Sequence, residues 1–290
     1  MDDELRGAYL RRLGLEAEDP SVEALHRIHR AHVELVPYET VWLHMSESWD
    51  IDPDASARRI AREHRGGYCF HLNGALSQLL RALGYEVTRH VGGVHGPDGP
   101  SGESMTNHLV LTVAGLASDE NPGGVWYVDA GLGDALHDPI PLVPGEYAQT
   151  PWHFELTETP GDVGDWHFRH DPRGTFVGMS FRSAPAGMAE FAARHRFLST
   201  SPESSFAHVV TAQLRDSAGV DILLGLVLSR AGSGASPAVA LTNRDDWFGV
   251  LADRFGIRLD GCDPVARDRL WERVLGAHRA WQADRDRNGS

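Results

Sequence analysis

Three side chains in this sequence have the types that nucleophilic catalysis by a thiol requires, and Cys69 is the first of them. It follows two glycines and opens a stretch whose leucines recur at helical spacing, which predicts a helix from the cysteine to about Gly84. The start of a helix carries unpaired N–H groups and the positive end of its dipole, so we expect a thiol there to ionise readily. The alternative is a buried structural cysteine after a glycine turn.

A nucleophilic cysteine also needs a base within hydrogen-bond reach and a third group that orients the base. Alternation in Thr106 to Val113 places His108 on the more polar face of a predicted strand. Asp129 ends an apolar strand, where a carboxylate is costly unless it is paired. An imidazolium at His108 would pair with it, and Asp129 would raise the basicity of the ring that deprotonates Cys69. The alternative, which spacing alone favours, is a satisfied core histidine and a turn-capping aspartate.

The hydrophobic period predicts the elements that must position these residues. Helical spacing predicts helices over 2–45, interrupted at Asp19-Pro20-Ser21, and over 51–63, 69–84, 186–195, 245–255 and 263–283. Alternating or β-branched runs predict strands over 86–91, 106–113, 125–128, 152–158, 166–170, 208–213 and 222–229. Segments 92–102 and 231–237 are rich in glycine and are predicted to be loops.

Composition limits the class of protein and of partner. The chain has 290 residues, of which 41% are hydrophobic, and this suffices for a globular protein without disulfide support. With only two cysteines and no signal peptide predicted at the acidic N-terminus, we expect a cytoplasmic location. No apolar run approaches the length of a membrane span. The formal net charge of −14 disfavours nucleic acid and anionic membranes as partners.

Histidines at positions 26, 29 and 32 raise the question of a metal site. Their spacing spreads them around a helix instead of gathering them on one ligand face. We therefore predict no metal.

Three segments together resemble a known family. They resemble the Cys, His and Asp motifs of the arylamine N-acetyltransferases, in the family's order and at similar separations. The three segments are RGGYCFHLNG, TNHLVLTV and WYVDAGLG. Segments 31–40, 197–206 and 241–257 resemble further parts of the family. The resemblance covers nearly the whole chain. It favours the functional interpretation of Cys69, His108 and Asp129 over the structural one.

The resemblance implies an α+β fold in three parts with a cysteine-protease-like Cys-His-Asp arrangement. Residues 1–84 would form a helical bundle that carries the nucleophile Cys69. Residues 85–195 would form a central antiparallel β-barrel that carries His108 and Asp129, and residues 196–290 an α/β lid.

The resemblance also implies an activity. Cys69 would take an acetyl group from the co-substrate acetyl-CoA and pass it, in a ping-pong reaction without a metal, to a small aryl amine or hydrazine. One alternative is an amide synthase, which joins a carrier-bound polyketide or another bulky acyl group to an aryl amine; its donor would be an acyl-CoA or an acyl carrier protein. A second alternative is a binding protein of the same fold without turnover.

Further site residues follow from the same resemblance. Glu39 and Arg65 would pair and tie two helices together beneath the site. Two departures stand out: His71 replaces the acid usual after Cys-Phe, and Leu132 replaces a phenylalanine, which we expect to widen the cavity. The implied residues of the substrate pocket are Tyr38, Tyr68, Phe70, Thr106, Gly131 and Leu132.

Overall fold

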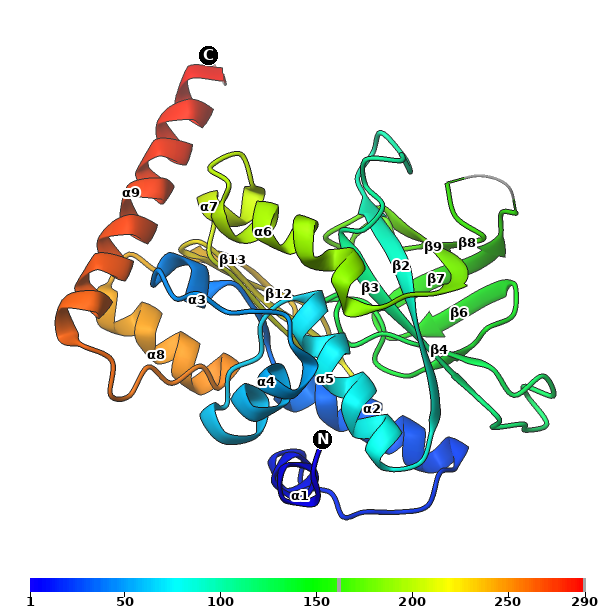
Figure 1. The fold of residues 1–290 in the computed structure, drawn as a ribbon. Coiled ribbons are helices and arrows are strands. Elements are labelled where there is room, and N and C mark those ends of the chain that lie inside the picture. Colours follow the sequence, from blue (N-terminus) through cyan, green and yellow to red (C-terminus); the bar gives the residue numbers. More distant parts are fainter. Residues whose placement is uncertain (161–162, 289–290) are drawn as a thin grey trace.

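The computed structural model describes residues 1–160 and 163–288, with the side chains of the last helix described through Ala283. N-terminal helices, a large antiparallel sheet and a C-terminal sheet with helices follow one another along the chain (Figure 1). The predicted α+β class, with a helical bundle, a β-barrel and an α/β lid, is confirmed. The last two residues of the predicted third part lie outside the described range.

The N-terminal helices pack around one buried helix, α5. Side chains of Asp2, Ser21 and Asp52 accept hydrogen bonds from the first turns of α1, α2 and α4, which explains where these helices begin. Along α5 nearly every residue from its start to Leu80 is buried. The elements are α1 (Asp3–Arg12), α2 (Val22–Leu35), α3 (Val41–His44), α4 (Pro53–Arg58), a π-helical turn (Arg59–Glu63) and α5 (Cys69–Ala82).

The turn that leads into α5 requires its two glycines. A Cβ atom at Gly66 would lie 1.8 Å from the carbonyl oxygen of Pro37, and Gly67 has φ +111°. An L side chain rarely adopts that backbone conformation. The close approach to Pro37 therefore fixes the position of the first residue of α5.

Eight strands form one antiparallel sheet that curls into a nearly closed barrel (Figure 1). The strand order is β5-β4-β3-β2-β9-β8-β7-β6. His108 begins β3 opposite Gly92 of β2, and Leu111 pairs with Val128 at the end of β4. The strands are β2 (Glu86–His95), β3 (His108–Ala114), β4 (Trp126–Val128), β5 (Ile140–Pro141), β6 (Gly145–Gln149), β7 (Trp152–Glu158), β8 (Trp166–Arg169) and β9 (Gly178–Pro185).

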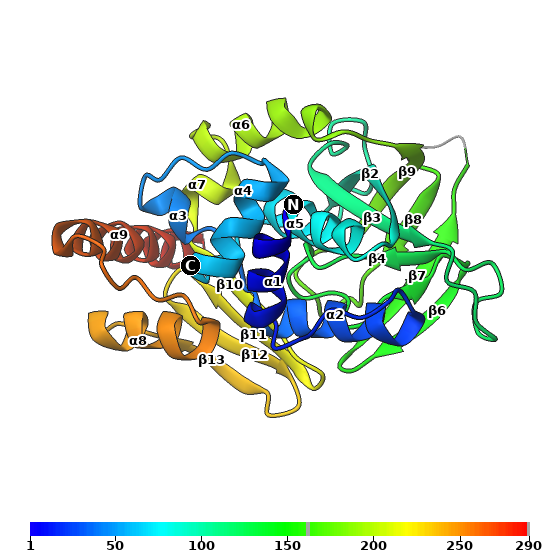
Figure 2. The ribbon, with the colours of Figure 1, turned by 60° about the horizontal axis from the view of Figure 1, so that its bottom comes forward.

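A second, five-stranded sheet begins with β1 (Tyr38–Glu39), which comes from the N-terminal part of the chain and pairs with β10. Helices α8 (Arg244–Phe255) and α9 (Pro264–Asn288) lie beside this sheet (Figure 2) and share a buried core with it. Between the barrel and this sheet the chain forms a 3-10 turn (Met188–Phe191), α6 (Ala192–Thr200) and α7 (Ser205–His208). The other strands are β10 (Thr211–Arg215), β11 (Gly219–Leu224), β12 (Val227–Gly232) and β13 (Ser236–Ala240).

Several of the predicted elements differ from the structure, three of them as follows. The strand expected over 222–229 is a hairpin, because Gly225 adopts φ +58° and reverses the chain between β11 and β12. The segment 231–237, which was expected to be a loop, contains the end of β12 and the start of β13. The first residues of the loop expected over 92–102 belong to β2. In both loops the glycine content misled the prediction, since pairing with a neighbouring strand outweighs local propensity.

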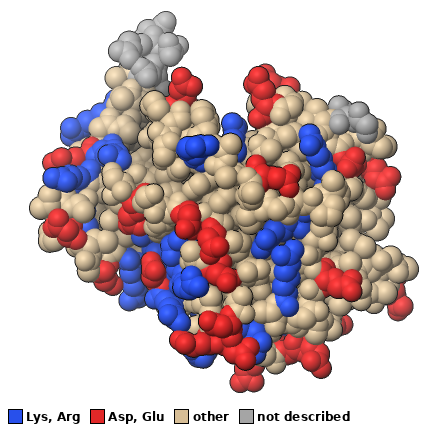
Figure 3. Space-filling model, in the orientation of Figure 1, with Lys and Arg blue, Asp and Glu red and all other residues tan. Residues whose placement is uncertain are grey.

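Charged side chains of both signs are interspersed over the face drawn in Figure 3. Within residues 1–160 and 163–288, no helix combines the length and the apolar character that crossing a membrane requires.

Glu39 and Arg65 form the pair that the sequence resemblance implied. Arg65 Nε donates to Glu39 Oε1 at 3.0 Å, and both side chains are buried. Glu39 lies in β1, however, so the pair joins a strand to the turn before α5 and does not join two helices. Pro37 explains why the helix does not continue to Glu39. Proline disfavours helical structure in the residue before it, so α2 ends at Leu35 and the chain then forms β1.

Replacing Arg65 by methionine is expected to lower the free energy of unfolding by about 3–5 kcal/mol, because Glu39 would be left charged and buried. The matched control is Arg62→Met, which breaks an exposed pair with Glu4 and should cost about 0–1 kcal/mol. Urea denaturation of both variants measures the difference. Equal losses in the two variants would contradict a special role for the buried pair.

Candidate active site

Cys69 is the first residue of α5, and its side chain lies against the barrel. It is 5% exposed, and its Sγ lies 3.5 Å from the carbonyl oxygen of Asn107, the residue before β3. Tyr68, which precedes the helix, has an extended backbone and provides no side-chain cap. The first N–H groups of α5 are thus left to act on the surroundings of the thiol.

His108 and Asp129 form a buried pair beside this thiol. His108 Nε2 lies 2.7 Å from Asp129 Oδ2, and each residue is 1% exposed. The Cys69 side chain neighbours the imidazole and contributes to raising its pKa. Because Nε2 faces the carboxylate, Nδ1 is the ring nitrogen left for the sulfur. The structure thus brings together all three residues on which the sequence analysis centred.

Asp129 accepts hydrogen bonds at both carboxylate oxygens. Besides His108, Tyr127 Oη donates to Oδ2 at 2.9 Å, and Asn73 Nδ2 and the Gly131 N–H donate to Oδ1 at 2.7 and 3.0 Å. Burial raises the pKa of Asp129, but the His108 charge and these donors outweigh it and hold that pKa below its usual value. The carboxylate is therefore charged at neutral pH.

The same pair stabilises a charged imidazole. Burial lowers the pKa of His108, but the negative charge of Asp129 and the hydrogen bond to it outweigh burial and hold that pKa well above its usual value. A cation beside a cysteine in general favours the thiolate form, which is the reactive one. Sulfur, ring and carboxylate can thus act as one proton-transfer unit.

Asn73 is a site residue that the sequence analysis missed. Its Nδ2 donates to Asp129 and also to the Leu109 carbonyl at 2.6 Å, and its Oδ1 accepts from the Ala130 N–H at 2.9 Å. One side chain thereby joins α5 to β3 and to the segment after β4. A signal was present, because Asn73 follows Cys69 by four positions and must share its helix face.

Gly131 allows the close contact between this segment and α5. A Cβ atom at residue 131 would lie 2.8 Å from the Cα atom of Cys69. Any larger residue would push the segment after Asp129 away from the helix that carries the thiol.

A cavity of about 460 Å³ opens over the thiol and the imidazole. Of the expected pocket residues, Tyr38, Gly131 and Leu132 line it. Tyr68 and Phe70 are fully buried outside its lining, and Thr106 lies outside it with φ +73°. The sequence analysis missed the other lining residues, which are Val94, Asn107, Thr175, Phe176, Arg194, Leu198, Ser205, Phe206, Thr211, Gln213 and Leu224.

His71 does not line this cavity. It is a fully buried residue of α5 and makes T-shaped contacts with the rings of Trp42 and Trp49, with centroid distances of 5.5 and 5.8 Å. Burial holds the pKa of His71 well below its usual value, so the ring is neutral. This departure from the family pattern therefore alters the core beneath the site.

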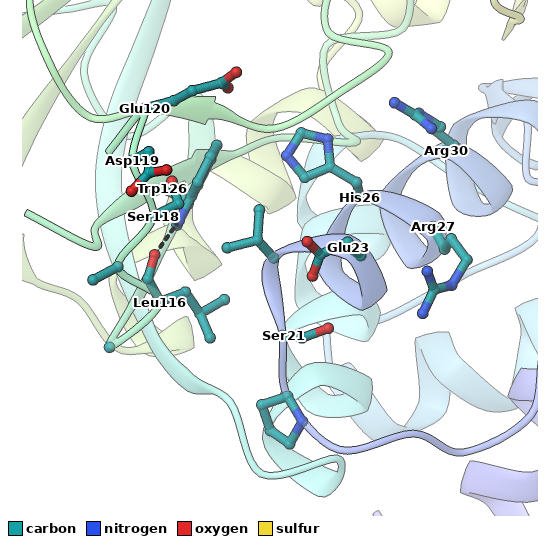
Figure 4. A pocket seen from close by; sticks show the side chains of 14 residues that line it. Ser21, Glu23, His26, Arg27, Arg30, Leu116, Ser118, Asp119, Glu120 and Trp126 are labelled. Atoms are coloured by element: carbon teal, nitrogen blue, oxygen red, sulfur yellow. Dashed lines mark hydrogen bonds between the residues drawn. The ribbon is translucent and has the colours of Figure 1, made fainter. Parts of the chain in front are cut away.

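A larger hollow of about 790 Å³ lies elsewhere, between the start of α2 and the loop after β3 (Figure 4). Trp126 Nε1 donates to the Leu116 carbonyl at its edge. Two of its basic side chains have carboxylate partners, since Arg27 pairs with Glu18 and Arg30 pairs with Asp138. Cys69, His108 and Asp129 do not line it, so the smaller cavity is the candidate active site.

Comparisons with known proteins identify the family. A family model described as N-acetyltransferase matches residues 21–263. The arylamine N-acetyltransferase of Mycolicibacterium smegmatis is 31% identical over 271 residues, which are 90% of this chain and 94% of that protein. The chain belongs to the arylamine N-acetyltransferase family. It is thus an enzyme of the acyltransferase class, as the sequence resemblance predicted.

Other members of the arylamine N-acetyltransferase family agree. The pineal gland isozyme NAT-3 of Gallus gallus is 30% identical over 233 residues, covering 73% of this chain and 77% of its own. The structure of the Mycobacterium marinum arylamine N-acetyltransferase in complex with CoA matches with a TM-score of 0.81 and 26% identity, covering 93% of this chain and 98% of that one. The Nocardia farcinica enzyme matches with a TM-score of 0.79 and 27% identity, covering 93% and 95%.

The environment of Cys69 predicts selective alkylation. We expect iodoacetamide near neutral pH to modify Cys69 about 10-fold faster than Cys262, because the neighbouring imidazolium favours a thiolate. Cys262 is the more exposed of the two, so exposure alone predicts the opposite order. Peptide mass spectrometry after timed labelling measures both rates, and a Cys262→Ala variant checks the assignment. Equal rates would contradict activation of the thiol.

Proposed function

We propose that this enzyme transfers an acetyl group from acetyl-CoA to an aryl amine or aryl hydrazine through an acetyl-Cys69 intermediate. The observation that carries the proposal is the buried contact of 2.7 Å between His108 and Asp129, beside a cavity that His108 lines together with Cys69. The family supports the overall reaction, and the structure of the M. marinum relative with CoA supports the donor.

In the first half-reaction, His108 holds the proton of the Cys69 thiol and the thiolate attacks the carbonyl carbon of acetyl-CoA. The oxygen becomes negatively charged beside the N–H groups that begin α5, which stabilise it. The bond between the carbonyl carbon and the CoA sulfur then breaks. CoA leaves as a thiol with the proton from His108, and Cys69 carries the acetyl group.

In the second half-reaction, the amine nitrogen attacks the acetyl-cysteine carbonyl. His108 accepts the proton that the nitrogen loses, and the bond between carbon and the Cys69 sulfur breaks. The product is an amide, and the starting ion pair is restored. The first exchange converts one thioester into another and is nearly balanced in energy, whereas formation of the amide is downhill.

Steady-state kinetics test this order of events. With acetyl-CoA and an aryl amine varied together, a covalent intermediate predicts parallel double-reciprocal lines. Intersecting lines would indicate direct transfer within a ternary complex. Failure of acetyl-CoA together with acylation by bulky acyl thioesters would favour the amide synthase, and binding of aryl amines without any turnover would favour a binding protein.

A further inference from the structure

Arg194 brings a positive charge to the lining of the active-site cavity. It lies on α6 and shares a helix face with Leu198, four positions later, which also lines the cavity. Its guanidinium carbon lies 5.1 Å from the centre of the Phe197 ring, a cation–π contact. Its Nε is buried and has no hydrogen-bond partner among the described residues.

Among the described residues that line the cavity, no acidic side chain compensates this charge. Within the part of the chain that the structure describes, none of the residues lining the cavity is aspartate or glutamate. Acidic residues are abundant elsewhere in the chain, which has 41 of them and a formal net charge of −14. In the hollow of Figure 4, by contrast, Arg27 and Arg30 each have a carboxylate partner. Arg194 is therefore available to a negatively charged ligand.

We propose that Arg194 binds an acidic group on the acceptor, so that the preferred acceptors are aryl amines that carry a carboxylate on the ring. A guanidinium recognises a carboxylate through two parallel N–H···O bonds, and these are strong in a partly buried site. The rigid ring would hold the carboxylate at α6 and its amine toward Cys69 on the barrel side. The proposal rests on the proposed function and narrows its substrate class.

The shared lining of Arg194 and Cys69 favours the acceptor over the donor as the source of the negative charge. Arg194 and Cys69 line the same cavity of about 460 Å³. In acetyl-CoA the whole pantetheine arm separates the phosphates from the thioester, whereas in an aminobenzoate a single ring separates the carboxylate from the amine. With the reacting group at Cys69 in both cases, the phosphates of acetyl-CoA therefore lie much farther from the thiol than the carboxylate of an aminobenzoate does.

Two variants and one control test the proposal in the full-length enzyme. Arg194→Met removes the charge and keeps an apolar side chain of similar length, whereas Arg194→Lys keeps the charge. Arg196→Met is the matched control, because Arg196 lies exposed on the same helix outside the cavity lining. The probes are 4-aminobenzoate and its neutral isostere 4-aminobenzamide, with acetyl-CoA as donor. For each protein we measure kcat/KM with both acceptors, the rate of acetyl-enzyme formation, and direct binding of both acceptors by calorimetry.

We expect Arg194→Met to lower the ratio of kcat/KM for 4-aminobenzoate to that for 4-aminobenzamide by about 10-fold or more, because a hydrogen bond to a charged group is lost. Arg194→Lys should recover part of the preference, and Arg196→Met should keep all of it. The rate of acetyl-enzyme formation should not change. An unchanged preference for 4-aminobenzoate in Arg194→Met would overturn the proposal. If that preference stayed intact while acetylation by acetyl-CoA became slower, Arg194 would instead be assigned to binding the phosphates of acetyl-CoA.

The calorimetric arm separates this proposal from the proposed function. If the wild-type protein transfers no acetyl group but binds 4-aminobenzoate more tightly than Arg194→Met does, the proposed function fails and the binding role of Arg194 stands. If transfer proceeds but both acceptors bind alike in the two proteins, the role of Arg194 fails and the proposed function stands.

Discussion

The Cys69→Ser protein is expected to lose acetyl transfer by about 10⁴-fold or more, the size of loss seen when a catalytic nucleophile is removed. A hydroxyl group is far less acidic than a thiol, so His108 and Asp129 cannot hold serine in its ionised form. The fold should survive, because the change replaces one sulfur by one oxygen at a site that borders a cavity. Values of kcat/KM and thermal unfolding curves measure the two effects.

Cys262→Ser is the control for this change. Cys262 lies between α8 and α9, outside the lining of the active-site cavity, so transfer should continue at the wild-type rate. Substantial transfer by Cys69→Ser would mean that the amine attacks acetyl-CoA directly, and the acetyl-Cys69 intermediate would be abandoned.

Asp129→Asn is expected to reduce transfer by about 10³–10⁴-fold, because a neutral amide cannot stabilise the imidazolium. Without the carboxylate, burial would lower the pKa of His108, so the ring would lose its charge at neutral pH. Oδ1 of Asp129 accepts hydrogen bonds from Asn73 and Gly131. If the side-chain NH2 group of the Asp129→Asn variant took the place of Oδ1, it would face these two donors. The rate at which iodoacetamide modifies Cys69 at neutral pH should fall below that of the wild type.

Tyr127→Phe separates the charge of Asp129 from its hydrogen bonds. This variant removes one neutral donor to Oδ2 and leaves the carboxylate charged, so transfer should fall by only about 10-fold or less. Equal losses in Asp129→Asn and Tyr127→Phe would show that orientation, and not charge, is what Asp129 contributes.

The residues at the base of the site could be predicted from the sequence because local patterns place them. Helical spacing after two glycines put Cys69 at the start of a helix, and the structure begins α5 at that residue. Alternation put His108 in a strand and Asp129 at the end of another, and β3 and β4 agree. Asn73 was within reach of the same reasoning, since its spacing from Cys69 settles its helix face.

The upper part of the cavity could not be predicted in this way. Arg194 and Gln213 reach the site only because α6 and β10 meet α5 and the barrel around one cavity, and no local period records that arrangement. The hairpin at Gly225 and the strand β13 were missed because pairing between strands overrides the preferences of short segments. The sequence thus predicts the chemistry at the base of the cavity better than the walls that select the acceptor.

Intact mass spectrometry tests the acetyl-Cys69 intermediate most directly. The wild-type protein is mixed with acetyl-CoA in the absence of any amine, and its mass is recorded before and after an aryl amine is added. We predict a gain of one acetyl group, located on the peptide that contains Cys69 and lost when the amine arrives. Acetylation of the amine by a protein that never gains this mass, or that gains it at another residue, would contradict the account.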